Sequence, residues 1–112
     1  METIKSRAEF EKVFSGGRRY NHQLVRMTVL MDNSDEGGLN KVAFVAPKRL
    51  GNAVFRNRCK RVLREASRAC GLPVKGADII LFATRRTHDS SPAEVSAALD
   101  GLLRKAGVNR DE

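Results

Sequence analysis

Residues 53–70, AVFRNRCKRVLREASRAC, decide how the rest of this chain is interpreted. At about 100° per residue, this segment forms a helix with two chemically opposite faces. The apolar face consists of Phe55, Cys59, Val62, Leu63, Ala66, Ala69 and Cys70. The polar face consists of Arg56, Asn57, Lys60, Arg61, Arg64 and Arg68. We therefore expect a helix that buries one side in a core and presents a row of cations on the other.

The charge of this helix is too one-sided for an ordinary solvated face. Such faces usually mix signs and carry Glu–Lys pairs four residues apart. Here Glu65 is the only acid of the segment, and residues 37–64 contain no Asp or Glu. The net charge of the whole chain is +8, which favours partners rich in phosphate. Clustered cations of this kind are typical of a nucleic-acid-binding surface.

Length and composition limit the other possibilities. A chain of 112 residues predicts one domain over 1–112 with a modest core, and 109–112 are expected to fray. No apolar run reaches the length of a membrane span and no secretory signal opens the chain, so we expect a cytoplasmic protein without a membrane partner.

Cys59 and Cys70 lie about 16 Å apart if both are helical, too far for a disulfide. We find no arrangement of Ser, His, Cys or acidic residues typical of catalysis or zinc binding, and no phosphate-binding glycine motif.

The rest of the chain reads as alternating helices and strands. Ser6 and Glu9 have the spacing of a capping box, and Gly16-Gly17 ends a short first helix. Ser91, Pro92 and Glu94 predict the start of a last helix. Between them we expect strands at 24–31, 41–46 and 77–84, an acidic turn at 32–38 and a polar loop at 85–90. This order predicts an α+β domain, whose strand 77–84 is apolar enough to be covered on both faces.

Residues 45–65, VAPKRLGNAVFRNRCKRVLRE, strongly resemble the protein subunit of bacterial ribonuclease P. The resemblance extends over about 7–107 and includes Phe10, Val13, Phe14 and Gly17 of the first helix. The chain departs from the family pattern at two places, both of which would contact the single-stranded 5′ leader of the family's substrate. Few cations precede Phe10, and Met27 stands where some members have an aromatic residue.

The resemblance implies a fold and a function. The fold is a small two-layer α/β sandwich with a mixed sheet, similar to the second domain of ribosomal S5-type proteins, with a left-handed crossover through the basic helix. General topology favours right-handed crossovers, so the hand is implied by the family alone. The implied function is that of the accessory subunit of an RNA-based endoribonuclease, which matures the 5′ end of tRNA. The catalyst would be the RNA, with Mg²⁺ held mainly by that RNA and no catalytic residue in the polypeptide.

The implied partners are the ribonuclease P RNA and precursor tRNA, with no obligate protein partner. Residues expected to bind RNA are Arg56, Asn57, Arg58, Lys60, Arg61, Arg64 and Arg68. A cleft between the sheet and the first helix, expected to hold the single-stranded 5′ leader, is assigned Phe10, Phe14, Met27, Lys48 and Arg49.

Several of these residues also have simpler interpretations. Asn57 can cap local backbone, and Arg58 can pair with local acids or cover the core with its stem. Phe10, Phe14 and Met27 can be core residues. Lys48 and Arg49 can belong to a solvated loop. The alternative function is a structural or ribosome-associated RNA-binding protein without a role in catalysis. A DNA-binding helix is disfavoured because the basic face has little to read bases.

Overall fold

The structure, a computed structural model, describes residues 7–31 and 40–108. The expected helix cap at Ser6, the turn at 32–38 and the frayed end at 109–112 lie outside these residues. The elements are α1 (Arg7–Gly16), β1 (Arg18–Asn21), β2 (Val25–Met31), β3 (Val42–Val45), the short 3-10 helix η1 (Lys48–Leu50), α2 (Ala53–Ala69), β4 (Ala77–Ala83) and α3 (Pro92–Ala106).

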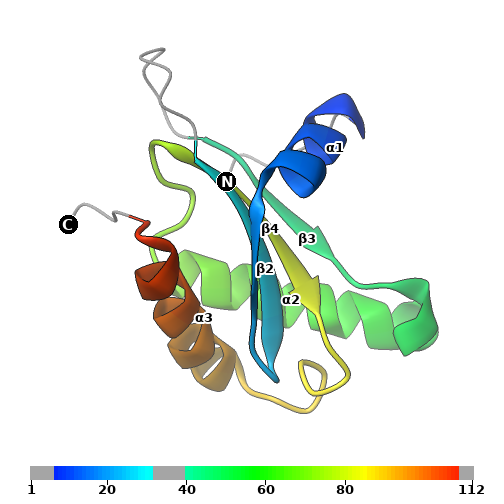
Figure 1. The fold of residues 1–112 in the computed structure, drawn as a ribbon. Coiled ribbons are helices and arrows are strands. Elements are labelled where there is room, and N and C mark those ends of the chain that lie inside the picture. The colour runs from blue at the N-terminus through cyan, green and yellow to red at the C-terminus, as the bar shows by residue number, and fades with distance from the viewer. Residues whose placement is uncertain (1–6, 32–39, 109–112) are drawn as a thin grey trace.

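The strands form one mixed sheet in the order β1-β2-β4-β3. β2 pairs antiparallel with both β1 and β4, whereas β3 pairs parallel with β4. The parallel pair is connected through α2, and the crossover followed in Figure 1 is left-handed, as the resemblance implies. The predicted α+β class and mixed sheet are therefore confirmed.

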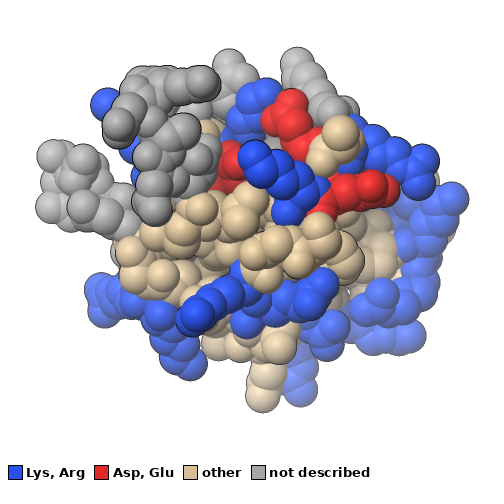
Figure 2. Space-filling model, turned by 45° about the horizontal axis from the view of Figure 1, so that its top comes forward, with Lys and Arg blue, Asp and Glu red and all other residues tan. Residues whose placement is uncertain are grey.

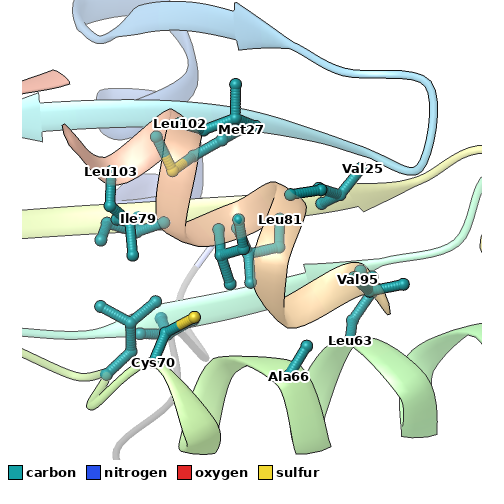
Figure 3. Packing of buried hydrophobic residues seen from close by; sticks show 14 of the residues in the cluster. Val25, Met27, Leu63, Ala66, Cys70, Ile79, Leu81, Val95, Leu102 and Leu103 are labelled. Carbon is teal, nitrogen blue, oxygen red and sulfur yellow. The ribbon is translucent and has the colours of Figure 1, made fainter. Parts of the chain in front are cut away.

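Helices cover both faces of the sheet. α2 and α3 lie together on one face and α1 lies against the other (Figure 1). Alternate residues of each strand face the two sides, so Ile79 and Leu81 join the larger core with α2 and α3, while Ile80 packs with Val13 of α1. The central strand β4 is thus buried on both faces, as its apolar sequence predicts. Figure 3 shows the larger core, in which side chains of β2 and β4 meet those of α2 and α3.

Local sequence explains where the helices begin. The Asn52 side chain accepts a 2.9 Å hydrogen bond from the backbone N–H of Phe55 and caps α2. Ser91 and Glu94 form the predicted capping box of α3, with Pro92 in the first turn. None of the helices within the described residues combines the length and apolar composition that a membrane crossing requires.

Candidate nucleic-acid interface

The basic face of α2 is largely exposed to solvent. Asn57, Arg61, Arg64 and Arg68 are exposed, and Arg56 and Lys60 are half-buried beside the core. No ion pair between residues that the structure describes involves a cation of α2. The Arg64 guanidinium lies over the Phe44 ring of β3, 5.5 Å from its centroid. The predicted row of cations is therefore held on a helix, and no carboxylate within 7–31 and 40–108 forms an ion pair with it.

Arg58 differs from the other cations of α2. It is exposed, and its Nε donates a 2.8 Å hydrogen bond to the backbone carbonyl of His88. The His88 ring stacks on Phe55, with centroids 4.0 Å apart and planes 2° from parallel. Arg58 and Phe55 thus attach the loop at 84–90 to α2. The pairing with acids that was left open for Arg58 is not observed among the described residues, where a backbone carbonyl is its partner instead, and RNA binding by this residue stays a prediction.

A hollow of about 340 Å³ lies between α1 and the sheet. Its lining residues are Phe14, Arg19, Asn21, Arg26, Met27, Thr28, Val45, Pro47, Arg49, Phe82 and Ala83. Phe14 is 40% exposed and meets Phe82 edge-on, with ring centroids 6.0 Å apart. The hollow therefore combines aromatic surface with three arginines, the combination that single-stranded nucleic acid requires.

The other residues expected in the cleft take different positions. Phe10 is half-buried, stacks beside Phe14 with centroids 6.1 Å apart, and packs against the smaller core. Arg49 of η1 lines the hollow, whereas Lys48 is exposed beside it without being a lining residue. Arg49 and Arg26 also line a second, more open hollow of about 450 Å³, together with Arg85 and Arg86.

Met27 borders the hollow, but its side chain points away from it. The Met27 side chain is 1% exposed and belongs to the larger core on the opposite face of the sheet (Figure 3). The hollow meets β2 at this residue, but its neighbours Arg26 and Thr28 point toward α1 because side chains alternate along a strand. The Met27 side chain therefore packs as its alternative interpretation describes, and contact between this residue and the leader stays a prediction.

Sequence reasoning missed several lining residues, among them Arg19, Arg26 and Phe82. Arg26 carries a usable signal, because it lies between buried Val25 and Met27 in its strand, whereas Phe82 lies in a strand that is apolar almost throughout. Arg19 carried no such signal, since β1 was not predicted as a strand at all. Its four residues, RRYN, contain only one half-buried side chain.

The two cysteines of the chain are buried, and two acids of α1 form ion pairs. Cys59 and Cys70 are not joined in a disulfide, as predicted, and burial raises the pKa of the Cys59 thiol. Glu9 and Glu11 pair with Lys41 and Arg7. Within 7–31 and 40–108, no three His, Cys, Asp or Glu residues are grouped so that they would hold a metal ion.

Comparison with known proteins decides the family. A family model described as Ribonuclease P matches residues 1–107 of this chain. The chain belongs to the ribonuclease P protein family. Among curated ribonuclease P protein components, that of Gluconacetobacter diazotrophicus is 39% identical and that of Dehalococcoides mccartyi 35% identical. The first alignment covers 97% of this chain and 94% of the relative, and the second covers 94% and 84%.

Solved ribonuclease P proteins have the same fold. The protein from Staphylococcus aureus superposes with a TM-score of 0.77 at 26% identity, covering 96% of this chain and 97% of the other. The Thermotoga maritima protein superposes with a TM-score of 0.72 over 93% of this chain and 97% of its own, and at 22% identity it supports the fold alone. Membership of the ribonuclease P family does not favour the alternative of a structural or ribosome-associated RNA-binding protein.

Proposed function

We propose that this ribonuclease P protein binds the ribonuclease P RNA through the basic face of α2 and holds the 5′ leader of precursor tRNA between α1 and the sheet. In this way it assists the RNA in removing the leader. One observation carries the proposal: the hollow with Phe14, Phe82, Arg19, Arg26 and Arg49 is open to solvent and has the chemistry of a single-strand site.

The two surfaces are connected by a short segment of chain. Arg49 of η1 lines the hollow, and α2 begins at Ala53 after Gly51 and the capping residue Asn52. RNA that binds along Arg61 and Arg64 and extends toward the start of α2 would therefore approach the hollow. A protein of this kind contributes affinity by phosphate contacts and leader contacts, both of which position the substrate without reading its sequence.

The chemical step is assigned to the RNA. Mg²⁺ bound to the RNA would neutralise phosphate charge and activate water. The protein's cations replace part of the counterion atmosphere of the RNA. This contribution matters most when magnesium is scarce, because the RNA phosphates are then poorly neutralised.

Reconstitution tests this proposal. Protein freed of RNA should leave precursor tRNA intact at every magnesium concentration. Combined with a cognate ribonuclease P RNA, it should increase cleavage at low magnesium, and the Arg61→Ala/Arg64→Ala variant should increase it less. Accurate cleavage at the mature 5′ end by RNA-free protein, or no stimulation of the RNA, contradicts the proposal.

A further inference from the structure

An arginine from the neighbouring strand already covers the ring of Phe14. The guanidinium carbon of Arg19 lies 4.6 Å from the Phe14 ring centroid, and Nη2 of Arg19 donates a 3.3 Å hydrogen bond to the Phe14 carbonyl oxygen. Phe10 stacks beside the same ring and Phe82 meets it edge-on. A nucleobase needs close approach to a ring face in order to stack. Arg19 and a base therefore exclude each other over the face that Arg19 covers.

Arg19 is held weakly in this position. It is exposed, and no carboxylate of the described residues forms an ion pair with it. Its pairing with Thr28 in the β1–β2 ladder places it on the face of the sheet that borders the hollow. A guanidinium has five N–H donors and binds a phosphate through two parallel hydrogen bonds. A phosphate in the hollow is consequently a better partner for Arg19 than the ring of Phe14.

We propose that Arg19 makes base stacking on Phe14 conditional on a backbone phosphate. The inference rests on the proposed leader site and specifies how that site selects its ligand. A phosphate of the entering strand binds the guanidinium of Arg19 and draws it away from the Phe14 ring. A base then stacks on the ring face that Arg19 had covered. The ligand class is a single-stranded oligonucleotide with its phosphodiesters, whereas a free nucleoside finds the ring covered.

The test separates the base from its phosphate. The holoenzyme, made of this protein and a cognate ribonuclease P RNA, is titrated with precursor tRNA whose leader is intact or carries an abasic residue at one position in turn, with either a phosphodiester or an uncharged methylphosphonate beside that position. The base effect is the ratio of the two dissociation constants, abasic over intact. In the wild type, the methylphosphonate should lower the base effect at one leader position by about twofold to fivefold, because Arg19 then stays over the Phe14 ring, whereas in Arg19→Ala the base effect should not depend on the linkage. The same variant should bind the abasic leader more weakly, with a salt slope smaller in magnitude by about 0.7.

Arg18→Ala is the matched control. Arg18 is exposed and adjacent, but its pairing with Val29 places it on the opposite face of the sheet. Its removal takes away the same charge and should leave the dependence of the base effect on the linkage as it is in the wild type. A wild-type base effect that does not depend on the linkage, or the same dependence in Arg19→Ala as in the wild type, overturns the inference. Failure of the proposed leader site is visible separately, as equal affinity of the wild-type holoenzyme for precursor and mature tRNA.

Discussion

Gly17 is the residue at which α1 meets the sheet. A Cβ at this position would lie 2.6 Å from the Val13 carbonyl oxygen and 2.7 Å from that of Val29. Both atoms belong to backbone, so the helix would have to move away from β2 to accommodate it. Because Phe14 is only three residues earlier in the chain, this close approach also sets the position of the aromatic wall of the hollow.

We predict that Gly17→Ala destabilises the protein by about 1–3 kcal/mol, as is typical of overpacking. The midpoint of urea unfolding should fall with little change in its slope. Gly101→Ala in α3 is the control, since nothing lies within 4 Å of a Cβ there. The control should stabilise by about 0.5–1 kcal/mol through helix propensity. Equal stability of Gly17→Ala and wild type contradicts this account of the α1–sheet contact.

Met27 and Arg26 show how far single residues could be predicted from sequence. Val25, Met27 and Val29 alternate with Arg26 and Thr28, and the structure places the first three side chains in the larger core. The prediction of Met27 in the cleft relied on a family position, with simple packing as its alternative. Which polar residue borders a hollow depends on the helix that covers that face, and sequence alone does not supply this information.

At the scale of elements, α2 is the best-predicted part of the molecule. The expected helix over 53–70 is observed at Ala53–Ala69, because its apolar stripe, its asparagine cap and the following Gly71 agree. β1 was missed for the opposite reason: RRYN is a short edge strand whose partner β2 supplies the hydrogen bonds. Pairing with a distant or neighbouring strand leaves no periodic signal in such a segment.

The basic face of α2 predicts a specific salt dependence. Arg61→Ala and Arg64→Ala should each weaken binding to the ribonuclease P RNA and lower the magnitude of the salt slope of log K by about 0.7–0.9. Lys105→Ala is the control, because Lys105 is an exposed cation of α3. It should change neither quantity appreciably. Unchanged affinity and slope in both α2 variants, measured by titration over a range of salt concentrations, refute phosphate binding by this face.

At the scale of the whole molecule, the sheet has a basic helix on one face and a hollow with basic borders on the other. The net charge of +8 is distributed so that α2 and the borders of the hollow are basic, and Figure 2 shows one face with many more cationic than acidic side chains. α3 packs against α2 from the side of the core, which leaves the polar side of α2 exposed. One small sheet thereby supports the basic helix on one face and the hollow on the other, the two surfaces for which we propose RNA binding and leader binding.

The affinity difference between precursor tRNA and mature tRNA tests the leader site most directly. Phe14→Ala should reduce this difference in the holoenzyme by about 1–3 kcal/mol, the contribution of one stacked base, while binding of mature tRNA stays nearly unchanged. Met31→Ala is the control, because it removes a 51% exposed apolar side chain of β2 outside the hollow. An unaltered difference in Phe14→Ala, or equal weakening of both tRNAs, would show that the leader does not bind between α1 and the sheet.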